Sequence, residues 1–522
     1  MPTTDVALAA GGSLPVPERI RAFQVLSLNT LAFLASFAVW MLNGVLVTFL
    51  VDNGVFPWTA SQMGWLLAAP VLTGSIMRLP VGVLTDKYGG RIVFTLVMVV
   101  AAASCFLLSY ARDFTGYFVA SLGFGMAGAT FAVGIAYTSL WFRKEHQGTA
   151  LGIFGAGNAG SAITSFGAPL LLVWLTRDGL EGWRQLPQIY AACLFVMAIG
   201  FWSLTYTRVA SAEGRLTLAS RLLPLRNVRV WRFGLYYFFV FGGFVALAQW
   251  LIPYYVTVYG ASIVLAGLLA TVFNLPSGVI RALGGWMSDL FGARRVMYWV
   301  FGTSLLCCLL LIFPRMEVYT PGRGVMNAKA GVVTSVAPDR IQVGERSYPV
   351  RTRQARPGSD FAVPGVDERL LIWPTVEAWQ EPVVAVGQKV AKKQLLARGV
   401  SHVYFQANVW IFTFLVFLLG IAMGIGKAGV YKYIPDYFPQ DVGVVGGMVG
   451  VIGGLGGFFC PVVFGYLLEM TGVWTTCWAF FALAVLVCLA WLHHAVSRLT
   501  REHSPHIANK WELGGSGELR RQ

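Results

Sequence analysis

Apolar segments of twenty or more residues recur along this 522-residue chain. Two examples are 23–50 and 474–492, each long enough to cross a hydrocarbon core of about 30 Å as a helix. Overall, 56% of the residues are hydrophobic and 12% are charged, whereas soluble globular chains average about 45–50% and about 25%. The sequence therefore excludes a water-soluble enzyme and predicts a polytopic membrane protein.

Twelve segments have the length and apolarity of membrane-spanning helices, so the predicted fold class is an all-α membrane protein. They fall near 22–50, 61–84, 91–110, 116–142, 148–175, 187–206, 233–258, 262–288, 294–313, 408–432, 442–469 and 473–497. Cysteine occurs only inside these apolar runs, which indicates small core residues rather than disulfides or metal ligands. We expect no cofactor and no metal site.

The basic residues are concentrated in alternate loops. The loops after the second, fourth, sixth and eighth segments carry Lys87, Arg91, Arg143, Lys144, Arg208, Arg215, Arg221, Arg226, Arg229, Arg232, Arg294 and Arg295. The opposite loops of the first six segments carry only Arg112, Arg177 and Arg184. The positive-inside rule then predicts a multi-pass protein of the cytoplasmic (inner) membrane with both termini cytoplasmic. The same rule, rather than binding of nucleic acid, accounts for the net charge of +15, and membrane lipids are the expected surroundings.

Residues 314–406 interrupt the helical pattern. Short alternating runs at 331–336, 340–343 and 382–386 predict strands, and thus a small β-rich insertion between the ninth and tenth helices. By the helix count this insertion lies outside the cytoplasm, and we interpret it as structural or partner-contacting. The predicted organisation is an N-terminal tail (1–21), a first six-helix half (22–206), a cytoplasmic linker (207–232), the start of the second half (233–313), the insertion (314–406), the rest of the second half (407–497) and a C-terminal tail (498–522).

An internal repeat relates the two halves. Arg78 precedes Asp86 by eight residues, Arg281 precedes Asp289 by eight residues, and the two copies are offset by 203 residues. The first copy continues as Gly-x-Leu-x-Asp-x-x-Gly-x-Arg and ends at Arg91, a pattern that resembles the cytoplasmic loop motif of the major facilitator superfamily. This resemblance implies two pseudo-symmetric halves of six helices that alternate access to a central site.

The charges of this loop motif are interpreted as gating and structural residues. Asp86 and Arg91 can make a charge-assisted contact between neighbouring helices. Asp289 is expected to pair in the same way with Arg294 or Arg295.

Arg78 and Arg281 differ from the loop charges because each lies about two helical turns, or roughly 12 Å, further into the membrane. A charge at that depth costs about 2.5–3.5 kcal/mol on insertion scales and marks a functional site by default. No acidic residue lies near the middle of any segment. Two unpaired guanidinium groups favour a planar oxyanion, which each group can bind through two parallel hydrogen bonds.

Two glycine-rich segments indicate a particular family within this superfamily. Gly155-Ala-Gly-Asn-Ala-Gly160 and the run from Gly446 to Gly457 resemble the two signatures of the nitrate/nitrite porter family. That resemblance implies binding of nitrate, with nitrite as a second substrate, by Arg78, Arg281 and Asn158. It further implies a backbone contact at Gly155 and an aromatic enclosure formed by Phe37, Phe131, Tyr237 and Phe241.

The tenth segment carries Lys427 and Lys432 in a pattern that resembles the proton–nitrate symporter branch of that family. Lys427 is therefore a candidate for proton coupling, with protons as the coupling ion. The alternative is a lysine that anchors its helix at the membrane interface.

Three other functions remain open. One is nitrate/nitrite antiport, because two like charges resist closure of an empty site. Another is transport of a different small organic anion by the same fold. A third is a sensor that uses the insertion as its ligand or partner module. No catalytic triad or phosphate loop indicates an enzyme, and we expect a monomer.

Overall fold

The computed structural model describes residues 16–209, 222–312, 316–352, 375–405, 409–438 and 442–503. It divides into two compact units. Helices build the larger unit, which comprises Met1–Thr257, Ala261–Leu310 and Thr413–Gln522. Strands build most of the smaller unit, which comprises Val258–Gly260 and Leu311–Phe412.

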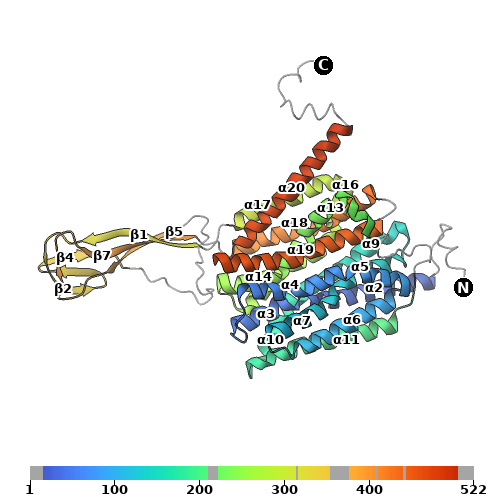
Figure 1. The fold of residues 1–522 in the computed structure, drawn as a ribbon, viewed down its shortest axis with the longest axis horizontal. Helices are drawn as coiled ribbons and strands as arrows, with labels where there is room; N and C mark the ends of the chain where they lie inside the picture. The colour runs from blue at the N-terminus through green and yellow to red at the C-terminus, as the bar shows by residue number, and fades with distance from the viewer. Residues whose placement is uncertain are drawn as a thin grey trace, which may run out of the picture. The chain divides into compact units, whose positions relative to one another are not determined.

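The helical unit is a bundle that runs from blue to red in Figure 1. Its first half contains α2 (Val16–Trp40), α3 (Leu42–Asp52), α4 (Ala60–Ile76), α5 (Arg78–Tyr88), α6 (Gly90–Leu108), α7 (Phe114–Phe124), α8 (Thr130–Ser139), α9 (Lys144–Gly155), α10 (Gly160–Leu175) and α11 (Gln185–Leu204). Its second half contains α13 (Val228–Tyr237), α14 (Phe244–Tyr259), α15 (Ile263–Val279), α16 (Arg281–Phe291), α17 (Ala293–Leu311), α18 (Val409–Tyr437), α19 (Val442–Thr471) and α20 (Thr476–His503).

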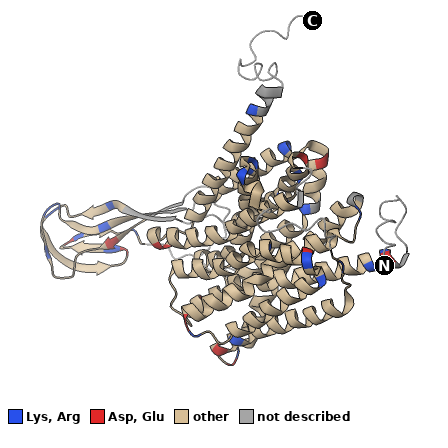
Figure 2. Ribbon diagram, turned by 45° about the vertical axis from the view of Figure 1, so that its right-hand side comes forward, with Lys and Arg blue, Asp and Glu red and all other residues tan. Residues whose placement is uncertain are grey.

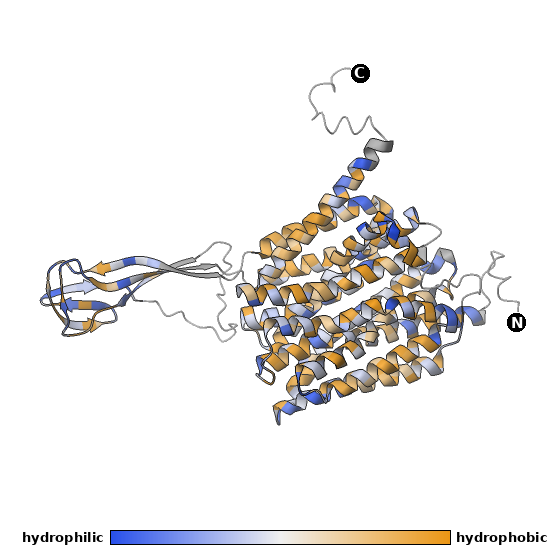
Figure 3. Cartoon of the chain, in the orientation of Figure 1, coloured by the Kyte–Doolittle hydropathy of each residue, from blue (hydrophilic) through white to orange (hydrophobic). Residues whose placement is uncertain are grey.

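The lengths of these helices match a membrane. Among the described residues, eleven helical stretches are long and apolar enough to cross it, and α15 with α16, bent by 50°, makes up to twelve. Apolar residues cover most of the bundle in Figure 3, and charged residues gather near the helix ends in Figure 2. The predicted all-α membrane fold is confirmed.

Several spans are broken near their middle. The break between α4 and α5 falls at Met77, and the break between α15 and α16 falls at Ile280, so Arg78 and Arg281 each begin a new helix. Pro80 contributes to the first break because it has no N–H to donate to the preceding turn. These equivalent breaks fit the 203-residue repeat.

Three further breaks have other helical geometries. Short 3₁₀ turns connect α7 to α8 (η1, Gly125–Ala129) and α9 to α10 (η2, Ala156–Ala159), and a π-helical turn connects α13 to α14 (η6, Phe238–Gly243). The two 3₁₀ turns are rich in glycine and alanine, and the π-helical turn ends in two glycines. Irregular backbone at membrane depth is tolerated only where protein or an aqueous cavity surrounds it, so these breaks mark the interior site.

The two halves of the bundle meet closely where α4 crosses α19. A Cβ at Gly64 would lie 2.5 Å from the Pro461 carbonyl oxygen, and a Cβ at Gly465 would lie 2.5 Å from that of Ala60. Only glycine allows this backbone approach. At the same end of the bundle the Glu469 carboxylate accepts a hydrogen bond from the Ser61 amide at 3.0 Å.

The smaller unit contains two antiparallel sheets. One sheet has the order β1 (Met316–Met326), β7 (Leu395–Phe405), β5 (Thr375–Pro382), and the other has β4 (Arg346–Pro349), β3 (Arg340–Val343), β2 (Gly331–Ala337), β6 (Lys389–Val390). Its buried core is mostly valine and centres on Val333, Ile341 and Leu396. A two-residue turn at Gly344 and Glu345 joins β3 to β4, and Gly344 takes the positive φ of 59° that this turn requires.

Two of the three predicted strands agree with β2 and β3, but the strand predicted over 382–386 is wrong. The observed strand β5 ends at Pro382. The chain then turns at Gly387, whose φ of 85° favours glycine, and the Gly387 amide donates to the Val333 carbonyl oxygen. The alternation of valines therefore reflects burial around a turn rather than a strand.

Candidate functional site

Arg78 lies inside the bundle with only 4% of its surface exposed. Its Nη1 donates to the Gly450 carbonyl oxygen on α19 at 2.7 Å. Its Nε and Nη2 are buried and have no hydrogen-bond partner among the described residues. A buried guanidinium with two N–H groups that lack hydrogen-bond acceptors lowers the stability of the fold unless a ligand accepts from them. This geometry therefore favours an anion-binding role.

Arg281 faces the same place from the second half. Its Nη1 is buried without a hydrogen-bond partner among the described residues, and its guanidinium lies 5.2 Å from the Tyr431 ring. Arg78 and Arg281 lie close enough to repel each other. The ion pairs of the described chain do not include either arginine. Since no carboxylate of the described chain neutralises the two arginines, a bound anion would reduce the repulsion between them.

Phe131 lies close to both guanidinium groups. Its ring centroid is 5.2 Å from the Cζ of Arg78 and 5.7 Å from the Cζ of Arg281. Phe241 lies 5.1 Å from the Cζ of Arg78, and its ring is 6.3 Å from that of Phe131 at an angle of 22°. Tyr237 stacks on Phe241 at 5.0 Å. The two arginines and three of the predicted aromatic residues thus form one cluster.

The glycine run of α19 makes room for this cluster. A Cβ at Gly453 would lie 2.2 Å from the Tyr237 ring. A Cβ at Gly454 would lie 2.5 Å from the Ser75 hydroxyl and 3.3 Å from Nη1 of Arg78. Bulkier residues at either position would displace the side chains that form the site.

Asn158 lies in η2 and is fully buried, and both polar atoms of its amide lack a hydrogen-bond partner among the described residues. Gly155 ends α9 just before this turn, and a Cβ added at Gly155 would lie 3.6 Å from Cδ of Arg281. Asn158 follows Gly155 by three residues along the same stretch of backbone. Its amide can donate to, or accept from, a ligand held there.

Lys427 is fully buried on α18. Its Nζ donates to the Ser277 carbonyl oxygen at 3.0 Å and to the Ser277 hydroxyl at 3.1 Å, and it lies 3.2 Å from the Phe244 ring centroid. It is near enough to Arg281 to be repelled by it. The Lys427 amine is therefore enclosed by protein and lies beside the cluster.

Comparison with known proteins now adds to this geometry. The family model described as Major Facilitator Superfamily matches residues 28–332 and 395–517. The chain belongs to the major facilitator superfamily. The two breaks at Met77 and Ile280 are therefore corresponding features of the two halves of a major facilitator fold.

Curated relatives refine the membership within the superfamily. The chain is 38% identical to a "Probable nitrate/nitrite antiporter NarK1" of Thermus thermophilus, over 96% of both chains. It is 24% identical to a "Nitrite extrusion protein" of Bacillus subtilis, over 90% of this chain and 94% of that protein. It is 26% identical to a "Probable nitrate transporter NarT" of Staphylococcus carnosus, over 90% and 95%. The resemblance to the nitrate/nitrite porters is confirmed.

Solved structures support the same fold. A bacterial homologue of the human lysosomal transporter Spinster, in an inward-facing and occupied conformation, matches with a TM-score of 0.56 and 14% identity, covering 93% of this chain and 98% of that chain. The nucleoside transporter NupG matches with a TM-score of 0.56 and 12% identity, covering 90% of this chain and 98% of that chain.

The loop motif of this major facilitator chain makes contacts that the sequence did not indicate. Gly89 and Gly292 take positive φ values of 88° and 81° at equivalent positions of the repeat. Arg91 donates through Nε and Nη2 to the Trp202 carbonyl oxygen at 2.9 and 2.6 Å, and its Cζ lies 4.4 Å from the Trp202 ring. Arg91 therefore joins α6 to the end of α11.

The expected pairing of Asp289 with Arg294 or Arg295 is wrong. Asp289 forms an ion pair with Lys432 of α18 at 2.5 Å, and Arg294 donates to the Tyr437 hydroxyl at 3.1 Å. The turn at Gly292 separates Asp289 from the arginines that follow it, whereas α18 brings Lys432 alongside. Both side chains of the pair are substantially exposed, so it contributes at most about 1 kcal/mol.

The sequence missed Trp40 and Tyr431. The Trp40 ring lies 5.9 Å from the Cζ of Arg78, and Phe37, which was predicted to enclose the ion, packs on Trp40 at 5.3 Å. Tyr431 packs on Tyr237 and donates to the Gly446 carbonyl oxygen. Helical spacing could have indicated both residues, because residues three or four apart lie on the same face of a helix. Trp40 follows Phe37 by three residues, and Tyr431 follows Lys427 by four.

Proposed function

We propose that this chain transports nitrate, with nitrite as a second substrate, across the cytoplasmic membrane by alternating access. The observation that carries this proposal is the pair of guanidinium groups, one from each half of the bundle, that lie 5.2 and 5.7 Å from the Phe131 ring centroid and form no ion pair among the described residues. Their N–H groups without hydrogen-bond partners among the described residues suit an oxyanion. Each planar guanidinium can donate two parallel hydrogen bonds to two oxygens of a planar ion. The printed names of the curated relatives agree with this substrate.

The aromatic rings favour a flat and small substrate. A flat ion sandwiched between two rings needs a ring separation of about 7 Å, since each contact is about 3.5 Å. The Phe131 and Phe241 rings are 6.3 Å apart and nearly parallel, so a small outward movement of either ring admits nitrate. A bulky organic anion would require the cluster to open much further.

Lys427 favours proton-coupled uptake. The Lys427 amine is buried and contacts Ser277 and the Phe244 ring. When protonated, it is repelled by Arg281. A nitrate ion near Arg281 would reduce that repulsion and stabilise the protonated amine. Binding of the anion and of a proton at Lys427 would then reinforce each other.

Nitrate/nitrite antiport is the second candidate mechanism. Repulsion between Arg78 and Arg281 opposes closure of an empty site, which favours the exchange of one anion for another. The printed name of the Thermus thermophilus relative also favours exchange. In either mechanism, we expect cytoplasmic termini, because basic residues are concentrated in the alternate loops on that side.

Transport by purified protein in proteoliposomes tests both the substrate and the coupling. Nitrate uptake should be followed with an imposed inward proton gradient or with nitrite trapped inside, and with neither. Symport predicts that the proton gradient alone accelerates uptake, whereas antiport predicts that only internal nitrite does. Failure to take up nitrate in all conditions, alongside transport of a larger organic anion, would contradict the proposal.

A further inference from the structure

Ser277 lies inside the bundle at the point where α15 approaches the Lys427 amine of α18. Its side chain is fully buried, and its hydroxyl and its carbonyl oxygen accept hydrogen bonds from the Lys427 Nζ at 3.1 and 3.0 Å. The Phe244 ring makes a third contact, with its centroid 3.2 Å from the same Nζ. Three electron-rich groups therefore surround an amine that has three N–H bonds to donate when it is charged.

These three contacts respond differently when the amine loses its proton. A carbonyl oxygen and the face of an aromatic ring can only accept, so both favour the ammonium over the neutral amine. A hydroxyl can accept or donate. The Ser277 hydroxyl can therefore accept an N–H from the ammonium and, after the proton leaves, donate its own O–H to the nitrogen lone pair. Of the three described contacts of the Lys427 amine, it alone fits both protonation states.

The position of Ser277 on α15 connects the amine to the anion site. Ser277 precedes Arg281 by four residues, and the helix break at Ile280 lies between them. One turn before Ser277, the Asn274 amide donates to the Ser165 hydroxyl of α10 at 2.7 Å, which joins α15 to the first half of the bundle. A hydroxyl on a helix supported in this way can keep its position while the charge of its partner changes.

The charge that acts on Lys427 from its surroundings is that of Arg281. The ion pairs of the described chain do not include Lys427. The elements packed around this part of α18 present uncharged residues, namely Val240, Phe244, Ser277 and Val300. Among the described residues, a hydroxyl rather than a carboxylate is therefore the polar side chain that responds to the proton on Lys427.

We propose that Ser277 is the positioning residue for the coupling proton, and that its hydroxyl changes from acceptor to donor each time Lys427 releases a proton. This inference rests on the proposed proton-coupled transport of nitrate and names the residue that makes its proton site reversible. On protonation, the nitrogen lone pair takes up a proton from water, the O–H···N hydrogen bond breaks, and the hydroxyl turns to accept an N–H. Release of the proton reverses these steps.

The pH dependence of transport by the purified full-length protein in proteoliposomes tests this role. Nitrate uptake should be measured with a constant inward proton gradient over a series of pH values, and nitrate/nitrite exchange at the same pH values without a gradient. Ser277→Ala should lower the pH of half-maximal proton-driven uptake by about half to one unit, because the charged amine loses a stronger hydrogen bond than the neutral amine does. Exchange should stay near the wild-type rate.

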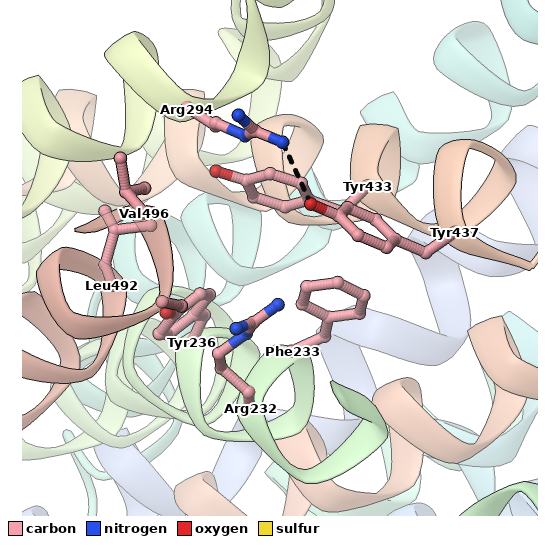
Figure 4. Close-up of a pocket in the computed structure, with 9 residues that line it drawn as sticks. Arg232, Phe233, Tyr236, Arg294, Tyr433, Tyr437, Leu492 and Val496 are labelled. Carbon is pink, nitrogen blue, oxygen red and sulfur yellow. Dashed lines mark hydrogen bonds between the residues drawn. The ribbon is translucent and has the colours of Figure 1, made fainter. Parts of the chain in front are cut away.

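Four further variants separate the hydroxyl from the packing. Ser277→Thr keeps the hydroxyl and should keep the wild-type pH of half-maximal uptake, whereas Ser277→Cys, with a weak thiol donor, should shift it as Ser277→Ala does. Ser288→Ala is the matched control, because Ser288 is a buried serine of α16 whose hydroxyl donates to the Gly284 carbonyl oxygen at 2.7 Å. Tyr437→Phe removes the hydrogen bond from Arg294 at the end of α18, shown in Figure 4. Neither control should shift the pH.

Several results would overturn the proposal. An unchanged pH of half-maximal uptake in Ser277→Ala and Ser277→Cys would show that the hydroxyl does not serve the proton. The same shift in Ser288→Ala, or an equal loss of uptake and exchange in a well-folded Ser277→Ala, would indicate a structural effect. Wild-type uptake that ignores the proton gradient would also overturn it, while exchange of nitrate would leave the proposed substrate intact. The proposed function itself fails only if the wild type moves nitrate in neither assay.

Discussion

Gly454→Ala is the substitution whose effect follows most directly from the geometry of the site. The added methyl group would lie 2.5 Å from the Ser75 hydroxyl, 3.1 Å from the Ser75 Cβ and 3.3 Å from Nη1 of Arg78. Overpacking of this kind costs about 1–3 kcal/mol. If Arg78 moves and loses one charge-assisted hydrogen bond to the anion, nitrate affinity should fall about 10- to 100-fold.

The same helix offers a matched control. A Cβ at Gly447 would meet nothing within 4 Å, so Gly447→Ala should leave transport unchanged and gain up to about 1 kcal/mol of helix propensity. The KM for nitrate uptake in proteoliposomes should be measured for both variants, with the Tm of each as a check on folding. Ser75→Gly combined with Gly454→Ala should recover most of the loss, because the two shortest contacts disappear.

A wild-type KM for Gly454→Ala in a well-folded protein would refute this reasoning, since Arg78 would then not be confined by α19. Equal loss in Gly447→Ala would refute it too, because the effect would belong to the helix and not to the contact. A loss that Ser75→Gly does not reduce would separate the defect from the crowding of Arg78.

Three further perturbations test other parts of the structure. Arg281→Lys keeps the charge but removes the guanidinium fork, so nitrate uptake should fall at least about tenfold, and a normal rate would count against two-pronged binding. Lys427→Met should reduce proton-driven uptake more than nitrate/nitrite exchange, and equal effects on both would remove its coupling role. Ile341→Ala should destabilise the strand unit by about 2–5 kcal/mol, seen as faster proteolysis there, while nitrate uptake stays normal; lost uptake would show that the insertion is needed for transport.

The sequence predicted the parts of the fold that depend on composition and spacing. Long apolar runs determined the membrane class, and the 203-residue offset between Arg78 and Arg281 predicted equivalent positions in two halves. The same spacing correctly anticipated that the two arginines approach each other. The depth of the two arginines in the membrane follows from the rise per residue of a helix, so contacts between helices were not needed to predict it.

The parts that depend on contacts between helices were less accessible. Asp289 was assigned a partner close in sequence, but Lys432 reaches it from α18, 143 residues further along the chain. Trp40 was overlooked because helical spacing around Phe37 does not say which of two aromatic residues faces Arg78. The breaks at Met77 and Ile280 were also not foreseen, since apolar periodicity continues across both.

Nitrate binding to the purified protein, measured by isothermal titration calorimetry, tests the central claim most directly. The account predicts that the wild-type protein binds nitrate, and that Arg78→Gln and Arg281→Gln each weaken binding at least about tenfold by removing charge-assisted hydrogen bonds. Arg295→Gln should bind like the wild type. Undiminished nitrate binding by either site variant would contradict the account, because the two guanidinium groups would then not hold the ion.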